Sequence, residues 1–314
     1  MQQNQHNKYS NDLDNDINIL EICNILLKGK WVISAVTIFT SILGIIYSLS
    51  LPNIYESKAI LVPVNSSSNT SRAYDTYSGL AGLAGINLSS NSTYSNSTKA
   101  YKKISSLSFF EKNIFMNIYL PDLMAIKVWN AETNTLVYDE SIYNELTNSW
   151  TRKTLNNQQE SPSVQEGFKK FVKENLSLSE DKDDGFINLS IRHQSPYIAK
   201  QWTELIVNEI NSFYRQKDKN EAEKAVNYLT QKMLSTSLAE IKQVLANLLK
   251  EETKKLTLIE ANEFYVFDYI DPPAIMETKS SPNRLVIIIL STLLGMMLSI
   301  LYLVTVKYFV KQQS

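Results

Sequence analysis

The chain has 314 residues, of which 31 are basic and 32 acidic, so its formal net charge is −1. A charge so close to zero gives no electrostatic reason to expect a nucleic-acid partner. The single cysteine, Cys23, excludes a disulfide within one chain. With only two histidines in addition, a zinc or haem site is not expected, and we expect no metal and no cofactor.

Two uncharged apolar stretches lie near the two ends of the chain, at residues 31–51 and 285–306. Each is long enough to cross a hydrocarbon core of about 30 Å at a rise of about 1.5 Å per residue. Neither stretch contains an acidic, basic or histidine residue, which disfavours ion transport and proton relay. The first stretch is long and follows a polar N-terminal segment, so a retained signal anchor is favoured over a cleaved signal peptide.

Basic residues flank the two stretches on the outer sides, with Lys28 and Lys30 before the first and Lys307 and Lys311 after the second. This bias predicts cytoplasmic termini and a periplasmic middle segment in a bacterial inner membrane. The expected order is an N-terminal tail, a transmembrane helix, a periplasmic domain, a second transmembrane helix and a C-terminal tail, at residues 1–30, 31–51, 52–284, 285–306 and 307–314.

The segment before the first span has apolar residues at roughly helical spacing over 17–27, and Asp16 could cap that helix. It could lie on the membrane face, or it could be a helical lead-in to the span. The sequence leaves both interpretations open.

The middle segment alternates helical and strand patterns. Residues 57–64 resemble a strand with an edge-type Pro63, and residues 186–192 and 264–270 also read as strands. Residues 65–98 read as a loop, in which Gly79–Gly85 suits a small-residue helix or flexible loop better than a phosphate-binding loop. Residues 104–180 are expected to be mostly helical. We therefore expect an α+β domain with a small, membrane-proximal mixed sheet and a long projecting helix.

That long helix is expected to start with Ser195 as its cap and Pro196 at its first position. No glycine or further proline follows until about Ile259, so a continuous helix would reach roughly 95 Å. It carries a heptad-like seam. The seam could pack against another helix of the same subunit or against neighbouring subunits, and we propose an oligomer interface at Leu234, Leu238, Ile241, Leu245 and Leu248.

Small residues recur four apart in both spans and would let helices approach closely. In the second span these are Ser291, Gly295 and Ser299, and in the first Gly44 lies between Thr40 and Ser48. Before the second span, prolines predict a stiff, extended, membrane-proximal strap. Its marker residues are Asp271, Pro272, Pro273, Pro282 and Arg284.

Catalytic patterns are weak throughout. The carboxylate pairs Glu251–Glu252 and Asp183–Asp184 are adjacent in sequence, whereas glycosidases hold two carboxylates across one bond. Aromatic residues could stack on sugars, but core packing explains them equally well, and Trp202 is expected in the core. The candidates are Tyr101, Trp129, Trp150 and Trp202. We expect no catalytic residues.

An ordered set of short motifs resembles the Wzz-type polysaccharide co-polymerases, the chain-length determinants of bacterial surface polysaccharides. Together with the two spans, the resemblance covers nearly the whole chain. It departs from the family at the strap, where Met276 and Lys279 stand at positions that often hold further prolines. The motifs are Asp16–Leu20, Pro52–Ala59, Leu83–Leu88, Ile187–Ile191 with Ser195–Ala199, and the strap from Asp271 to Arg284.

The resemblance implies a non-enzymatic inner-membrane protein that sets the modal length of lipopolysaccharide O-antigen made by a separate polymerase. It also implies a homo-oligomeric ring, with O-antigen polymerase, lipid-linked polysaccharide and membrane lipid as candidate partners. The alternative is an adaptor of a capsule or other polysaccharide export complex, coupled to a separate kinase. A fused kinase or a sensor with a cytoplasmic module is not expected, because both tails are short.

Overall fold

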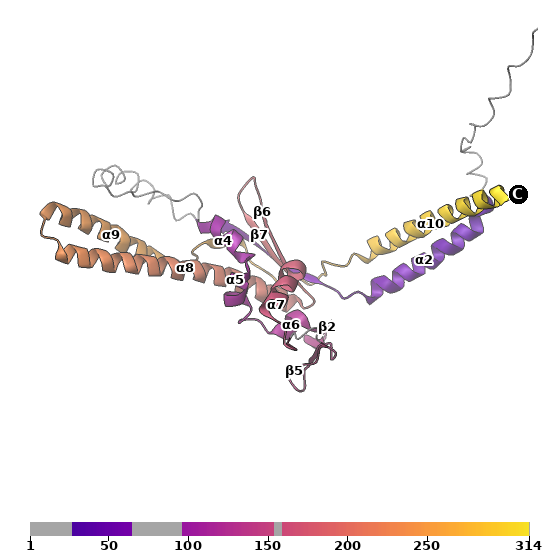
Figure 1. Ribbon diagram of the computed structural model, residues 1–314, viewed down its shortest axis with the longest axis horizontal. Helices are drawn as coiled ribbons and strands as arrows, with labels where there is room; N and C mark the ends of the chain where they lie inside the picture. The colour runs from indigo at the N-terminus through magenta and orange to yellow at the C-terminus, as the bar shows by residue number, and fades with distance from the viewer. Residues whose placement is uncertain (1–26, 65–95, 154–158, 314) are drawn as a thin grey trace, which may run out of the picture. The chain divides into compact units, whose positions relative to one another are not determined.

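The computed structural model describes residues 27–64, 96–153 and 159–313. These residues form two compact units, one comprising the described residues up to Asn53 and from Ser281 onward, and the other Ile54–Ser280 (Figure 1). The loop run Gly79–Gly85, the motif Leu83–Leu88 and nearly all of the lead-in segment 17–27 lie outside the described residues.

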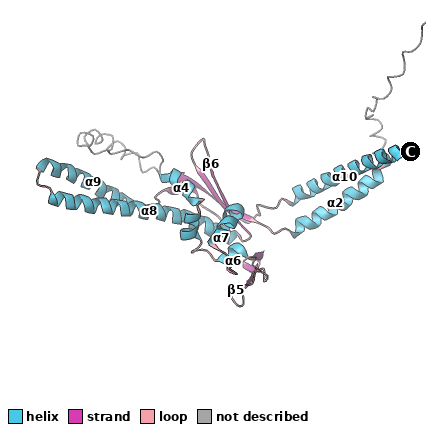
Figure 2. Ribbon diagram, in the orientation of Figure 1, coloured by secondary structure: helices cyan, strands magenta, loops and turns pink. Residues whose placement is uncertain are grey.

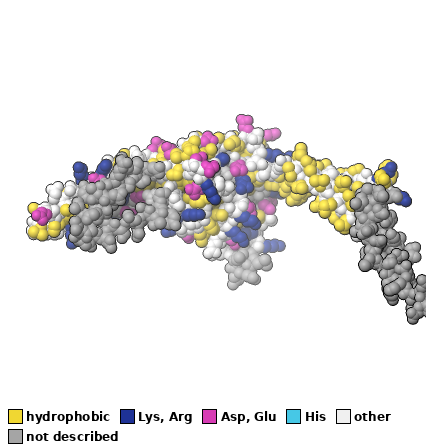
Figure 3. All heavy atoms as spheres, turned by 90° about the horizontal axis from the view of Figure 1, so that it is seen from above, with side chains coloured by type: hydrophobic (Ala, Val, Ile, Leu, Met, Phe, Trp, Pro, Cys, Tyr) yellow, Lys and Arg dark blue, Asp and Glu magenta, His cyan; other side chains and the backbone are white. Residues whose placement is uncertain are grey.

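The first unit is a pair of helices, α2 (Lys30–Ser50) and α10 (Arg284–Gln313), which lie side by side. Both are long and apolar enough to cross a membrane. Their side chains form a largely hydrophobic surface, whereas the charged side chains gather on the second unit (Figure 3). Helix α2 ends where Leu51 turns to extended backbone, directly before Pro52.

The second unit is built on a four-stranded sheet in the order β6–β7–β1–β8. Every neighbouring pair is antiparallel, so the expected mixed sheet is antiparallel throughout. A tight turn joins β6 to β7, and such a turn can connect only antiparallel strands. The strands are β1 (Tyr55–Pro63), β6 (Leu176–Glu180), β7 (Ile187–His193) and β8 (Phe267–Asp271).

Strand β1 is an inner strand, which corrects the expectation of an edge strand. Pro63 is tolerated because it is the last residue of β1, beyond the segment Tyr55–Leu61 that pairs with β7. On its other side it lies opposite Phe267 of β8. The missing amide hydrogen therefore removes no bond from the β1–β7 ladder.

The first half of helix α8 (Pro196–Ser235) packs across this sheet and completes the core (Figure 2). Ile206, Val207 and Ile210 of α8 are fully buried, as are Leu189 of β7 and Phe267 of β8. Trp202 is buried as expected. Burying each large apolar side chain contributes about 1.5–3 kcal/mol, so this contact stabilises the unit.

Residues 104–180 contain five strands as well as short helices, which corrects the expectation of a mostly helical segment. The helices are α4 (Asn96–Ile104), α5 (Leu107–Phe109), η1 (Phe110–Ile114), α6 (Leu120–Met124), α7 (Val164–Lys170) and η2 (Phe171–Asn175). Besides β6, the strands are β2 (Ile126–Asn130), β3 (Thr135–Tyr138), β4 (Tyr143–Asn144) and β5 (Ser149–Trp150).

The hairpins β2–β3 and β4–β5 share one turn chemistry. The side-chain oxygen of Asn130 accepts hydrogen bonds from the backbone two and three residues ahead, and Asn144 does the same in the second hairpin. Asn134 and Asn148 close the two turns with φ of 50° and 48°, a conformation that asparagine tolerates. The sequence signal is the pattern Asn-x-x-Thr-Asn-Thr/Ser, which occurs once in each turn.

The expected continuous helix is broken into a helical hairpin, α8 and α9 (Ala239–Ala261), which lie side by side. The break needs neither glycine nor proline. Thr236 and Leu238 adopt extended backbone, and the hydroxyls of Ser235 and Thr236 donate to the carbonyl of Lys232. Side-chain bonds of this kind compete with helix continuation. Folding back lets α9 return the chain to β8.

Candidate functional site

The two carboxylate pairs of the sequence are not arranged as a catalytic site. Asp184 accepts a hydrogen bond from the backbone of Phe186 in the β6–β7 turn, and Asp183 lies in the same turn. Glu251 and Glu252 are neighbours on α9. Within residues 27–64, 96–153 and 159–313, no group of three His, Cys, Asp or Glu side chains could hold a metal ion.

The small residues of the two spans face one another within one chain. Gly44 of α2 lies against Ser291 of α10, and Gly295 of α10 lies against Thr40 of α2. A Cβ atom at either glycine would overlap the opposite side chain. Ser299 is buried as well. Close approach of two helices in lipid depends on such small side chains.

The five residues proposed as an oligomer interface fall into two groups. Leu234, Leu238 and Ile241 lie at the tip of the helical hairpin and are 78%, 62% and 47% exposed. Leu245 and Leu248 lie further along α9 and are partly buried. Contacts within one chain therefore bury Leu245 and Leu248 in part and leave the three residues at the tip exposed.

The strap runs beside the start of β1. Asp271 ends β8, and Pro272 and Pro273 follow without regular structure. Ser57 then donates to the carbonyl of Ala274 at 2.9 Å, and the amide of Ser280 donates to the carbonyl of Ile54 at 2.8 Å. Prolines cannot donate to a ladder, so this stretch follows β1 without extending β8.

Two further marker residues of the strap belong to the helix-pair unit. Arg284 begins α10 and donates to the side chain of Asn53 at 3.1 Å, and Pro282 precedes it. The ends of the two spans are thus joined by a side-chain bond close to where the chain leaves them.

Asn211 is a structural anchor that no sequence pattern indicates. Its side-chain oxygen accepts hydrogen bonds from the backbone amides of Tyr265, Val266 and Phe267 at 3.2, 2.7 and 3.0 Å. Its side-chain nitrogen donates to the carbonyl of Phe267 at 2.9 Å. One buried amide on α8 therefore fixes the start of β8. An isolated Asn on a helix carries no signal of such a distant partner.

His193 is a second buried polar anchor. Its Nδ1 accepts a hydrogen bond from the backbone amide of Ser195 at 2.9 Å, which leaves Nε2 to donate to the carbonyl of Asp122 at 3.1 Å. Burial lowers the pKa of His193 to about 4, so the ring is neutral at neutral pH. Ser195 is the N-cap residue of α8 and Pro196 lies in its first turn, as expected, although the Ser195 side chain makes no capping hydrogen bond.

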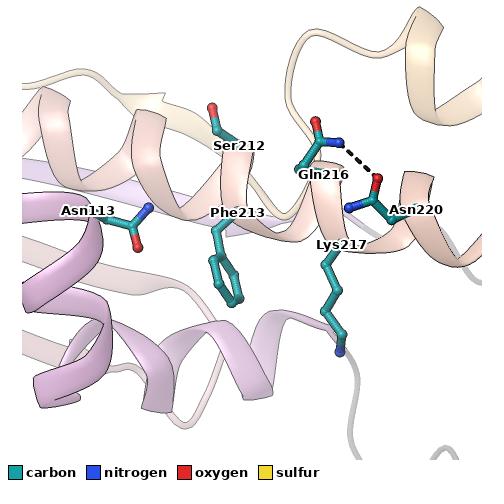
Figure 4. Close-up of a pocket in the computed structure, with 6 residues that line it drawn as sticks. All are labelled: Asn113, Ser212, Phe213, Gln216, Lys217 and Asn220. Atoms are coloured by element: carbon teal, nitrogen blue, oxygen red, sulfur yellow. Dashed lines mark hydrogen bonds between the residues drawn. The ribbon is translucent and has the colours of Figure 1, made fainter.

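An open groove of about 610 Å³ lies along the middle of α8 (Figure 4). Its six lining residues comprise three amides, one hydroxyl, one ammonium and one aromatic ring, with no carboxylate among them. Five come from α8 and one from η1: Ser212, Phe213, Gln216, Lys217, Asn220 and Asn113. The aromatic residues proposed for sugar stacking, Tyr101, Trp129, Trp150 and Trp202, do not line it.

Comparison with known proteins places the first third of the chain in a family. Residues 15–114 match the family model described as Wzz, chain length determinant protein. Over these residues the chain is similar to the Wzz family. The match confirms the resemblance to Wzz-type polysaccharide co-polymerases, and it includes the motifs Asp16–Leu20, Pro52–Ala59 and Leu83–Leu88. The motifs after residue 114 lie outside the match.

Two solved structures are similar to large parts of the chain at low identity. A full-length bacterial polysaccharide co-polymerase is 13% identical, with 94% of this chain and 99% of that chain covered and a TM-score of 0.39. A fragment of WzzB, a polysaccharide co-polymerase from Salmonella Typhimurium, is 14% identical, with 73% and 100% covered and a TM-score of 0.27. Both scores are below 0.5, so the fold described above rests on this chain alone. No curated protein matches the chain.

Proposed function

We propose that this chain regulates the length of a bacterial surface polysaccharide and that this polysaccharide is lipopolysaccharide O-antigen. The observation that carries the proposal is the Wzz domain match over residues 15–114. The pair of candidate membrane helices fits a protein of the inner membrane, where O-antigen repeat units would be polymerised by a separate enzyme.

We further propose that both termini are cytoplasmic and that residues 52–284 lie in the periplasm. The bias of lysines towards the outer flanks of the two spans supports this orientation. In this position the domain would act as a scaffold for the polymerase and its lipid-linked product, without making or breaking glycosidic bonds itself.

The same proposal includes a homo-oligomer, held in part by the hairpin tip. The support is the exposed apolar group Leu234, Leu238 and Ile241, since exposed apolar groups of this kind often mark protein contacts. Ile241→Asp would place a charge in that surface and should lower the mass of the assembly seen by native mass spectrometry. An assembly of unchanged mass would rule out the tip as an intersubunit contact.

The proposed function is tested by a gel ladder of surface lipopolysaccharide from a strain that lacks this chain, with and without the chain restored. Restoration should convert a broad ladder into a cluster of band lengths. If restoration leaves the ladder unchanged, O-antigen length control is wrong. Export of another polysaccharide, with or without a separate kinase, would then be the function to examine.

A further inference from the structure

Helix α8 carries a stripe of uncharged polar side chains, which we call the amide track. Its members are Asn208, Ser212, Gln216 and Asn220, each four residues after the last, and all four are exposed. A spacing of four places side chains on one face of a helix. From its first to its last member the track advances twelve residue steps along the helix, and therefore about 18 Å.

The track interrupts the charge pattern of the helix. The next positions in the same series are charged, namely Glu204 before the track and Lys224 after it. Exposed charged residues elsewhere on α8 pair four residues apart, such as Lys217 with Glu221 at 3.9 Å. Pairs of this kind stabilise an exposed helix face. A solvated face of this helix would thus be expected to carry charge, and the track does not.

The track borders the open groove that Figure 4 shows. Ser212 and Gln216 project from one side of α8, and Phe213 and Lys217 project from the other. Asn113 extends into the groove from η1, held by a hydrogen bond of 3.0 Å from its side-chain nitrogen to Glu209. The groove thus combines amide groups with one aromatic ring.

Hydrogen-bonding capacity on the track is left unused by the protein. Gln216 donates to the side-chain oxygen of Asn220 at 3.0 Å, which orients both amides. Within the described part of the chain, the oxygen of Gln216 and the nitrogen of Asn220 have no further partner. The pair therefore leaves one acceptor and one donor for a hydroxyl-bearing ligand.

We propose that the amide track, with Asn113 beside it, binds a neutral stretch of polysaccharide. Sugar hydroxyls both donate and accept hydrogen bonds, and amide side chains match both roles. The groove lining holds no carboxylate, which suits an uncharged ligand. Phe213 lines the groove but packs edge-on against Phe109, with the Lys103 ammonium 5.3 Å from its ring centroid, so it is not counted as a stacking surface. The inference rests on the proposed function and assigns a ligand surface to it.

The test uses the full chain in lipid nanodiscs and, as probe, the polysaccharide released by mild acid from the lipopolysaccharide of its own strain. The variant is Gln216→Ala with Asn220→Ala. The matched control is Gln243→Ala with Asn247→Ala, an exposed Gln–Asn pair with the same spacing on α9. Saturation-transfer NMR and a binding isotherm report contact and affinity. Loss of two hydrogen-bonding groups should weaken binding about tenfold, and the control should bind like the wild type.

Three outcomes would overturn the assignment: no binding by the wild type, equal weakening by both pairs, or a changed mass of the assembly in the Gln216/Asn220 variant. The last outcome would make this face a contact between copies of the chain. The lipopolysaccharide ladder separates the two proposals. A clustered ladder without polysaccharide binding would support length regulation and contradict binding at the amide track. Loss of binding in the Gln216/Asn220 variant alone would support the amide track as a ligand surface, even if the lipopolysaccharide ladder were unchanged by restoring the chain.

Discussion

The two halves of helix α8 differ in how much of their surface one chain can cover. In the first half, Ile206, Val207 and Ile210 are at most 1% exposed, and the Asn211 side chain is hydrogen-bonded through both its oxygen and its nitrogen. At the far end, Leu234 is 78% exposed, and Leu238 just beyond the helix is 62% exposed. The base of the helix therefore determines the fold of one chain. The tip holds apolar surface that contributes little to that fold.

Asn211→Ala should have the largest effect and would sharpen this comparison at the base. It leaves three backbone amides at the start of β8 without their acceptor, and each unsatisfied buried group costs about 1–3 kcal/mol. We expect a loss of roughly 3–5 kcal/mol in the free energy of unfolding, measured by urea titration. The control is Asn227→Ala, an exposed Asn nearer the tip, which should change stability by less than about 0.5 kcal/mol. Equal losses of stability in the two variants would contradict the difference between the base and the tip of α8.

The buried His193 should make the base sensitive to acid. Its pKa is about 4 in the folded chain and 6.5 when exposed, so the unfolded chain binds the proton more readily. Stability from this residue is full above pH 6.5 and is lost as the pH falls towards 4, by about 3 kcal/mol in total. Burial raises the pKa of Asp122, which works in the opposite direction at lower pH. His193→Gln should flatten the dependence between pH 6.5 and 4, and an unchanged slope would contradict this assignment.

Leu245→Ala and Leu248→Ala should have an intermediate effect, because both side chains are partly buried along α9. Partial burial implies a loss of about 1–2 kcal/mol for each, below the 2–5 kcal/mol of a fully buried leucine. Thermal unfolding of each single variant measures this loss. A loss as large as that of a core leucine would show that the well-packed part of the hairpin extends further towards the tip than these two positions indicate.

Leu238→Ser should have the smallest effect on stability, below about 0.5 kcal/mol, because the side chain is 62% exposed. If the tip contacts other copies, the same change should lower the mass of the assembly without changing the unfolding of the monomer. Native mass spectrometry and thermal unfolding of one preparation separate the two effects. A large loss of monomer stability would show that the tip does contribute to the fold of one chain.

The elements with simple periodicity were predictable from the sequence. The apolar helical stretches Lys30–Ser50 and Arg284–Val306, β1, β7 and the start of α8 at Pro196 agree with expectation to within two residues, although α10 itself continues to Gln313. Each has a local pattern, either uninterrupted apolar residues, strict alternation or a proline at the first turn. The hairpin break at residues 236–238 was missed because it rests on hydroxyl bonds and on the packing of α9.

The polar anchors could not be predicted because their partners are far away in sequence. Asn211 and Val266 are 55 residues apart, and His193 and Asp122 are 71 apart. The groove depends on Asn113 and α8, which only the fold brings together. By contrast, the four-residue spacing of the amide track is visible in the sequence, but its meaning depends on knowing that all four side chains are exposed.

The hydrogen bond of 2.8 Å between Ser280 and Ile54 brings the first and last residues of one compact unit together. Because its ends lie together, the unit can be expressed without the two helices. A short glycine linker would join its ends without stretching any strand. The same geometry permits new termini at an exposed turn, such as the one around Leu146. It also permits the unit to be transplanted onto a different pair of membrane helices.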